Sequence, residues 1–356
     1  MSKSLIIRLL LVFVFLQINA SYCVFGQTPC KIEATIKGLT DRPILIRYVK
    51  QGAFTDDTVT VRQGKFTHLI ASADGDIATL IINSSTQLSF WTDSPLVSIT
   101  GTAGPSVILK CTGTPENNLL ELHRNTIERP YATLRKGKSS DKADAILLQE
   151  YKATRYFISQ HSATLTAAYL LYWQAMYDIT IFNELEQLLA GLSPSVRNSY
   201  WAAKAVTRIY NIRNRPRVGK KVPSFSLPDS SGHIITLDSL KGKYVLIDFW
   251  GTWCKPCVAS IPELKATQAT LRDRLIIFSI ALERPRDREK WLQIIRKYEL
   301  EWIQTAEFTG SKEGVNALYN VVEYPTLLLI DPDGILVAKI KSGESIKDQI
   351  SQLIHK

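Results

Sequence analysis

The feature that most restricts the fold of this chain is a pair of cysteines, Cys254 and Cys257, separated by two residues. An apolar run over 245–249 ends shortly before the pair and predicts a buried strand. The helix expected over 255–271 then begins at the first cysteine. Because a helix N-terminus carries partial positive charge, it favours the thiolate of Cys254 over the thiol. Cys257 can then attack a mixed disulfide formed at Cys254, so the spacing predicts a dithiol that exchanges disulfides.

Other uses of a cysteine pair are disfavoured by the surrounding residues. A zinc site needs about four ligands, and His233 is isolated from any second Cys/His pair. Covalent haem attachment requires His directly after the second cysteine, where Val258 stands. A peroxide-reducing cysteine needs Pro and Thr at the positions that Ile247 and Gly251 occupy. We therefore expect disulfide exchange without a metal or cofactor.

The N-terminus is typical of an export signal. Lys3 and Arg8 form a cationic start. An apolar run follows over 9–16, and small and polar residues come after it up to Gly26. The run is too short to span a bilayer. We therefore expect a signal peptide over 1–26 and a mature protein in the periplasm or cell envelope.

Three alternatives for this N-terminus stay open. Cleavage after Ala20 also fits the small residues, and an uncleaved run would act as a membrane anchor. Lipid attachment at Cys23 is the third, disfavoured because Tyr22 is large for the preceding position. No later apolar run approaches the ~18 residues that a membrane span requires.

The chain is basic, with a formal net charge of +10. Its cationic residues concentrate in one stretch, at Lys204, Arg208, Arg213, Arg215, Arg217, Lys220 and Lys221. This stretch contains no recognised nucleic-acid-binding motif. We interpret it as a solvated helix end and linker, and expect no nucleic-acid partner.

Periodicity divides the chain into three parts after the signal. Over 27–114, apolar and polar residues alternate in short segments between turn residues, which predicts an antiparallel β-sandwich. Over 115–215 the period becomes helical, and an aromatic stripe is expected to face the core: Tyr169, Tyr172, Trp173, Met176 and Tyr177. Over 216–356 strands and helices alternate, which predicts an α/β sheet covered on both faces.

Further motifs accompany the cysteine pair in the last two fifths of the chain. In order they are Val222-Pro223-Ser224-Phe225-Ser226-Leu227, Gly232, Leu237, Leu240-Lys241-Gly242-Lys243, Phe249-Trp250-Gly251-Thr252-Trp253-Cys254-Lys255-Pro256-Cys257, Pro262, Tyr324-Pro325-Thr326 and Ile330-Asp331-Pro332-Asp333-Gly334. This combination resembles the thioredoxin-fold domains of the TlpA/ResA type, which are envelope-facing thiol-disulfide oxidoreductases. The segment from Cys30 to about Thr114 resembles, less specifically, the all-β domain of unknown function that commonly precedes them.

The resemblance implies roles for four residues. Cys254 is the nucleophile and Cys257 the resolving thiol, and Pro325 matches the cis-proline that faces the dithiol. Asp248 matches the buried carboxylate of thioredoxin itself. Burial should raise its pKa and let it accept the proton of Cys257.

Two further positions bear on that assignment. ResA-type enzymes commonly place Glu three residues after the second cysteine, where this chain has Ser260. The departure leaves Asp248 as the candidate base. Glu283, which follows the strand expected over 275–281, is expected at the surface.

The residues next to the dithiol are expected to contact a client protein. They are Trp253, Lys255, Pro256, Tyr324 and Thr326. Trp253 and Trp250 would form an apolar surface, and the cation of Lys255 favours the thiolate. Pro256 constrains the turn between the cysteines, and Pro262 should kink the following helix.

The direction of exchange, and whether exchange is the main function, stay open. The residues between the cysteines lack the His of strongly oxidising sites, so we favour a reductase of protein disulfides, supplied by a membrane-linked electron donor. The alternatives are a disulfide oxidase or isomerase, and an envelope binding protein with a secondary redox module. A bridge between Cys30 and Cys111 also stays open, because free buried cysteines are common.

Overall fold

The computed structural model describes residues 29–50, 53–71, 73, 76–103, 108–177, 182–308, 314–341 and 343–354. The expected signal peptide and Cys23 lie outside these residues. The chain forms two compact units, one of Met1–Gln174 with Leu188–Ala203 and the other of Ala175–Gln187 with Lys204–Lys356. Within the described residues, no helix is both long and apolar enough to cross a membrane.

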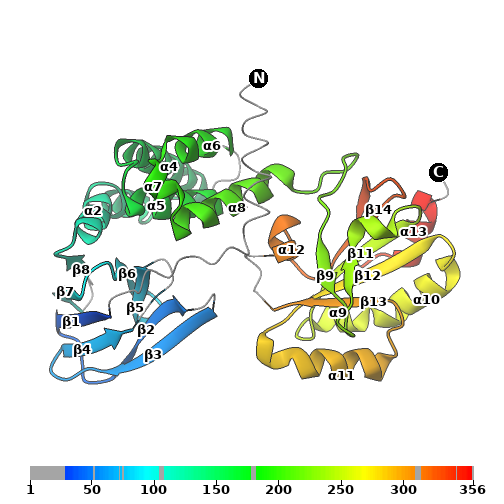
Figure 1. Ribbon diagram of the computed structural model, residues 1–356, viewed down its shortest axis with the longest axis horizontal. Helices are drawn as coiled ribbons and strands as arrows, with labels where there is room; N and C mark the ends of the chain where they lie inside the picture. The colour runs from blue at the N-terminus through cyan, green and yellow to red at the C-terminus, as the bar shows by residue number, and fades with distance from the viewer. Residues whose placement is uncertain are drawn as a thin grey trace. The chain divides into compact units, whose positions relative to one another are not determined.

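The first unit contains two four-stranded sheets, ordered β4-β1-β7-β8 and β3-β2-β5-β6 (Figure 1). Their strands are β1 (Cys30–Lys37), β2 (Pro43–Lys50), β3 (Ala53–Thr60), β4 (Lys65–Ile70), β5 (Ile77–Asn83), β6 (Thr86–Trp91), β7 (Leu96–Thr102) and β8 (Ile108–Thr112). Residues of β1 are alternately buried and exposed, and one apolar core joins both sheets. The expected β-sandwich is confirmed, except that β1 and β7 run parallel. β1 lies between β4, to which it is antiparallel, and β7, to which it is parallel.

This strand order decides the state of two cysteines. Cys30 lies on β1 and Cys111 on β8, and β7 separates the two strands. Both thiols are buried and free, so the bridge that the sequence left open is not formed. Burial raises the pKa of Cys30 to about 11 and that of Cys111 to about 12. Both therefore remain protonated at neutral pH.

Helices follow the sandwich, as the change of period predicts. They are α2 (Pro115–His123), the π-helix η2 (Arg124–Glu128), α3 (Arg129–Arg135), α4 (Ser140–Gln160), α5 (Leu165–Tyr177), α6 (Phe182–Gly191), α7 (Pro194–Arg197) and α8 (Tyr200–Asn214). In the aromatic stripe of α5, Tyr169 is buried against Trp91 and Trp201. Tyr177, at the end of the helix, is exposed instead, which corrects the expectation for this residue.

A five-stranded sheet, ordered β13-β12-β11-β14-β15, is the centre of the second unit. Its strands are β11 (Tyr244–Trp250), β12 (Leu275–Leu282), β13 (Ile303–Glu307), β14 (Thr326–Ile330) and β15 (Leu336–Ile340), and a separate hairpin joins β9 (Ser226–Pro228) to β10 (Ile234–Thr236). β11, β12 and β13 are parallel, whereas β14 is antiparallel to β11. Every residue of β11 after Tyr244 is buried, as expected for a central strand.

Helices cover both faces of this sheet, which confirms the expected thioredoxin fold. They are η3 (Leu237–Leu240), α9 (Lys255–Ala259), α10 (Ile261–Leu271), η4 (Pro285–Asp287), α11 (Arg288–Tyr298), α12 (Gly314–Leu318) and α13 (Ile346–Ile354). One core joins α10 and α13 to one face, and another joins α12 and Phe225 to the opposite face. The helix expected over 255–271 is divided at Ser260, because Pro262 in the first turn of α10 has no N–H to continue α9.

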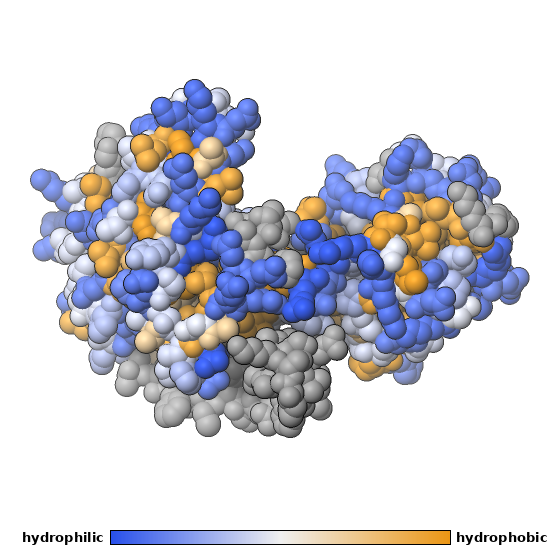
Figure 2. Space-filling model, turned by 90° about the horizontal axis from the view of Figure 1, so that it is seen from above, coloured by the Kyte–Doolittle hydropathy of each residue, from blue (hydrophilic) through white to orange (hydrophobic). Residues whose placement is uncertain are grey.

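Hydrophilic side chains cover much of the face drawn in Figure 2, and apolar side chains gather in patches between them. Such patches are normal on a folded protein, because apolar atoms contribute about half of its accessible surface. Among the described residues, the large exposed apolar side chains of the second unit are Tyr177, Val218, Ile234, Trp253 and Val322. Trp253 is next in sequence to the dithiol.

Candidate active site

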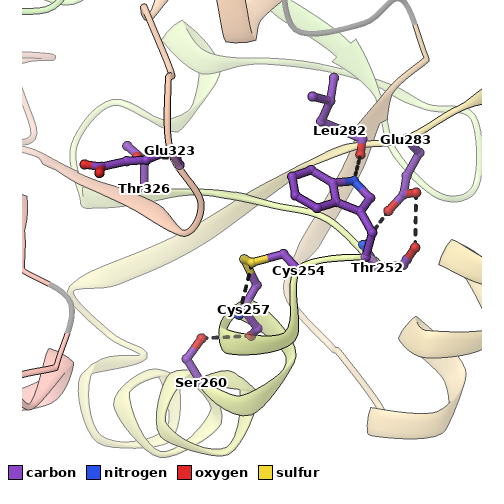
Figure 3. The surroundings of a disulfide bond; sticks show 9 residues. Thr252, Cys254, Cys257, Ser260, Leu282, Glu283, Glu323 and Thr326 are labelled. Atoms are coloured by element: carbon purple, nitrogen blue, oxygen red, sulfur yellow. Dashed lines mark hydrogen bonds between the residues drawn. A yellow bond between two sulfur atoms is a disulfide. The ribbon is translucent and has the colours of Figure 1, made fainter. Parts of the chain in front are cut away.

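The cysteine pair lies where β11 passes into α9, and Cys254 is the N-cap of that helix. The backbone N–H of Cys257 donates to the Sγ of Cys254 at 3.3 Å (Figure 3). The two cysteines form a disulfide, and both side chains are buried. The structure therefore represents the oxidised state. A sulfur that already accepts an N–H at a helix start is placed to be stabilised as a thiolate after reduction.

Ser260 terminates α9 directly after this motif. Its hydroxyl donates to the backbone carbonyl of Cys257 at 2.8 Å (Figure 3). The position that commonly holds Glu in ResA-type enzymes is thus occupied by a side chain that satisfies the helix end. It supplies no carboxylate for proton transfer.

Asp248 is buried on β11, with 5% of its surface exposed. Its neighbours on the same face of the strand are Leu246, which belongs to the core under α10, and Trp250, which belongs to the same buried cluster as both cysteines. The carboxylate therefore lies on the face of the sheet that α9 and α10 cover. Burial raises its pKa from 3.8 to about 6, and a hydrogen bond from Ser279 partly opposes the rise. A carboxyl with that pKa can take up a proton near neutral pH.

Pro325 begins the loop-to-strand transition at β14, and the Tyr324–Pro325 peptide bond is cis. Thr326 is paired with Phe249 of β11, which brings this loop to the strand that leads to the dithiol. The ring of Tyr324 contacts that of Trp253 edge to face, with centroids 5.1 Å apart. The structure thus brings the predicted residues of the two distant motifs together.

The five residues expected to contact a client differ in exposure. Trp253 is 53% exposed, and its indole N–H donates to the carbonyl of Leu282 at 2.8 Å, which holds the ring in place. Lys255 and Pro256 are exposed and Tyr324 is half-buried. Thr326 is buried and donates to the carbonyl of Glu323, so it offers the least side-chain surface.

Glu283 is buried, with 4% exposed, so its expected surface position is wrong. Its carboxylate accepts the backbone N–H of Thr252 at 2.5 Å and the Thr252 hydroxyl at 3.1 Å (Figure 3). Burial raises its pKa. Glu283 is buried because its backbone still pairs with the neighbouring strand. Its N–H donates to the carbonyl of Glu307 at the end of β13, which holds the residue against the sheet.

A second carboxylate at this edge was missed by the sequence analysis. Glu307, the last residue of β13, accepts the backbone N–H groups of Val315 and Asn316 at the start of α12. Asn316 in turn accepts the hydroxyl of Tyr324 at 2.7 Å. The available signal was an acid at the carboxyl end of two parallel strands, Glu283 after β12 and Glu307 in β13, at the edge where sites of α/β sheets form.

Among the residues that the structure describes, no three His, Cys, Asp or Glu side chains gather as ligands for a metal ion. The side chains of Thr252, Glu283 and Ser260 beside the dithiol are instead bonded to backbone and to one another, whereas the buried Trp250 indole N–H has no hydrogen-bond partner among the described residues. They are arranged to hold a loop and a helix start. What they can support chemically is thiol exchange coupled to a buried acid.

Two family models match separate parts of the chain. Residues 218–339 match the AhpC/TSA family, and residues 30–120 match a domain of unknown function, DUF4369. The first match covers the sheet, the dithiol and the cis-proline loop. The second covers the β-sandwich and the start of the helices, and assigns no activity to them.

Individual relatives match the C-terminal part. The thioredoxin-like protein YneN of Bacillus subtilis is 34% identical over 134 residues, 38% of this chain and 76% of that protein. The thiol-disulfide oxidoreductase ResA of Bacillus cereus (strain ZK / E33L) is 33% identical over 144 residues, 40% of this chain and 80% of that protein. The crystal structure of the thioredoxin domain of a thiol-disulfide oxidoreductase from Bacteroides vulgatus is 28% identical, with a TM-score of 0.36, over 38% of this chain and 96% of that chain. By its sequence relationship to ResA, this chain belongs to the family of thioredoxin-fold thiol-disulfide oxidoreductases.

Proposed function

We propose that this protein is an exported reductase of protein disulfides that acts through Cys254 and Cys257. The observation that carries the proposal is the position of Cys254 as the N-cap of α9, with its sulfur accepting the N–H of Cys257. This environment favours the thiolate that attack requires. Export is supported by the N-terminal sequence, whose expected cleavage leaves a mature chain in the periplasm or cell envelope.

The reaction begins with the protein in its dithiol form. The Cys254 thiolate attacks one sulfur of the client disulfide, which breaks that bond and releases the first client thiolate. Asp248 then takes the proton of Cys257, and the new thiolate attacks the Cys254 sulfur. The second client thiolate leaves as the Cys254–Cys257 disulfide forms. Two electrons have passed from the dithiol to the client, the Cys257 proton is on Asp248, and the two client thiolates take up protons from Asp248 and from solvent.

Client recognition would use the surface around the cysteines. The exposed ring of Trp253, supported by Tyr324, supplies an apolar contact, and Lys255 and Pro256 flank it. Pro325 has no N–H, which leaves the neighbouring backbone available for pairing with an extended client segment. Thr326 takes part through its backbone, because its side chain is buried.

The direction of exchange rests on the residues between the cysteines. Lys255 and Pro256 lack the His of strongly oxidising sites, which favours reduction. A reductase must be reduced again after each cycle, so the proposal includes a membrane-linked electron donor. We also propose the four segments 1–26, 27–114, 115–215 and 216–356 as signal peptide, β-domain, helical region and redox domain.

Reduction of insulin by the wild-type protein in the presence of dithiothreitol tests the activity. Cys254→Ser should abolish it, and Cys257→Ser should accumulate a mixed disulfide with the client. Cys30→Ala is the matched control, because that thiol is free and in the other unit. Equal activity of wild type and Cys254→Ser would refute the enzymatic role and leave a binding protein. A reduction potential of about −120 mV would instead indicate an oxidase.

A further inference from the structure

A polar row crosses the buried face of the C-terminal sheet beneath α9 and α10. Asp248 of β11 is paired with Ser279 of β12, which is paired with Gln304 of β13. Directly opposite residues in a sheet share one face. All three side chains are at most 5% exposed. Most residues around this row are apolar, so Asp248 and Ser279 depend on each other, whereas the buried Gln304 side-chain amide has no hydrogen-bond partner among the described residues.

Two hydrogen bonds connect this row to Trp302, which precedes β13. The Trp302 indole N–H donates to the Ser279 Oγ at 2.8 Å, and the Ser279 hydroxyl donates to the Asp248 Oδ2 at 2.7 Å. The direction of these two hydrogen bonds follows from which groups carry a hydrogen to donate. An indole N–H is a donor and never an acceptor, and a hydroxyl has a single hydrogen to donate. Ser279 therefore accepts from Trp302 and directs its own hydrogen at Asp248.

The two hydrogen bonds from Trp302 to Ser279 and from Ser279 to Asp248 stabilise the charged form of Asp248. No charged side chain among the described residues contributes to its pKa, which burial raises and the Ser279 hydrogen bond lowers. The facing residue of β14 is Leu327, and the buried residues that α9 and α10 contribute to the cores on this face of the sheet include Cys257 and Leu264. Ser279 is therefore the main group that compensates the buried carboxylate.

We propose that Ser279 and Trp302 are positioning residues for disulfide exchange, which hold Asp248 in one orientation and keep it ionised so that it can accept the proton of Cys257. The inference rests on the proposed role of Asp248. Without the hydroxyl, desolvation would be less compensated and the carboxyl would stay protonated to higher pH. A protonated Asp248 cannot take the proton, so resolution of the mixed disulfide would slow at neutral pH.

The first test observes Asp248 directly in the oxidised protein, where Cys254 and Cys257 form a disulfide and do not titrate. The carboxyl carbon is titrated by ¹³C NMR in the full chain, in wild type and in Ser279→Ala. Ser279→Ala removes a hydrogen bond to the charged carboxylate, and this loss should raise the titration midpoint of Asp248 by about one pH unit. Trp302→Phe should give a smaller upward shift, because Ser279 can still donate. Trp302→Phe also tests the role of these hydrogen bonds if Ser279→Ala does not fold.

Thr305→Val is the matched control. The Thr305 hydroxyl is buried on β13 and donates to the backbone carbonyl of Ser279 at 3.0 Å, without contacting Asp248. Its removal deletes a buried hydroxyl that bonds to the same residue, Ser279, and should leave the titration of Asp248 unchanged. A shift equal to that of Ser279→Ala would show that the effect is structural and would overturn the inference.

The second test is the pH dependence of insulin reduction. The acidic limb of the rate profile should move upward by the same amount in Ser279→Ala as the NMR midpoint. An unmoved NMR titration overturns the inference and leaves the proposed reduction intact. An NMR shift with an unmoved rate profile also overturns it, because Asp248 then does not accept the proton. Failure of the wild type to reduce insulin would instead refute the proposed function.

Discussion

Glu283 accepts two hydrogen bonds from Thr252, one from the backbone N–H at 2.5 Å and one from the hydroxyl at 3.1 Å. Thr252 is two residues before Cys254, so these bonds fasten the end of β12 to the loop that carries the dithiol. Trp253, which lies between Thr252 and Cys254, donates its indole N–H to the carbonyl of Leu282 in the same strand. The loop is therefore held from both its backbone and its side chains before α9 begins.

Replacing Glu283 should weaken both the fold and the reaction. Glu283→Ala leaves the buried Thr252 N–H without an acceptor, which costs about 1–3 kcal/mol of unfolding free energy. Displacement of the dithiol loop should lower the rate of insulin reduction on the order of tenfold. The control is Glu263→Ala, whose carboxylate accepts the N–H of Ile346 in the same unit. It should lose comparable stability with an unchanged rate; an equal fall in rate would contradict the local role of Glu283.

Removing the charge of Asp248 should stabilise the oxidised protein at neutral pH. The carboxyl pKa is about 6 in the folded protein, against an ordinary value of 3.8. Above about pH 6 the folded state therefore holds a charge that unfolding would release to water, at a cost on the order of 3 kcal/mol. As pH falls through the folded pKa, the folded state binds a proton first and the cost shrinks. It is gone below about pH 4, where both states are protonated.

Denaturant unfolding of Asp248→Asn and wild type at about pH 7 and about pH 4 measures this effect. The gain should be present at the higher pH and absent at the lower one. The same variant should reduce insulin slowly, since it has no carboxylate to accept the Cys257 proton. A stability gain that is equal at both pH values would show that charge burial is not its cause.

Truncating the exposed indole should weaken client binding more than chemistry. Trp253→Ala removes a ring that is 53% exposed beside the dithiol. We expect KM for insulin to rise on the order of tenfold, with a smaller change in kcat, as for an aromatic contact residue. Ile234→Ala is the control, because that side chain is 66% exposed on β10 in the same unit. A comparable rise in KM for Ile234→Ala would argue against a localised client surface.

The two cysteines of the sandwich should behave as inert thiols. Burial holds the pKa of Cys30 at about 11 and that of Cys111 at about 12, so neither forms appreciable thiolate at neutral pH. Alkylation followed by peptide mapping should label both in denaturant without reductant, and neither in the native protein. Recovery of a peptide that links Cys30 to Cys111 would refute the free state.

Local pattern was sufficient for the elements and for the dithiol. Alternation in β1 predicts one buried face, and the apolar run of β11 predicts a central strand, because side-chain periodicity is a property of the backbone geometry alone. The cysteine spacing predicts exchange for a similar reason, since two residues fix how closely the thiols approach. The helix break at Ser260 was likewise readable, because Pro262 lacks an N–H wherever it stands.

Contacts between strands could not be read in this way. Glu283 was expected at the surface and is buried, Cys30 and Cys111 are kept apart by β7, and Ser279 carried no signal of its pairing with Asp248. The sequence by itself determined the redox pair, the order of its supporting motifs and the alternating strands. Only the tertiary structure decided which acids are buried and which groups donate hydrogen bonds to them. The physical reason is that strand register places residues about thirty positions apart within hydrogen-bonding distance, and burial then shifts the pKa of the acid.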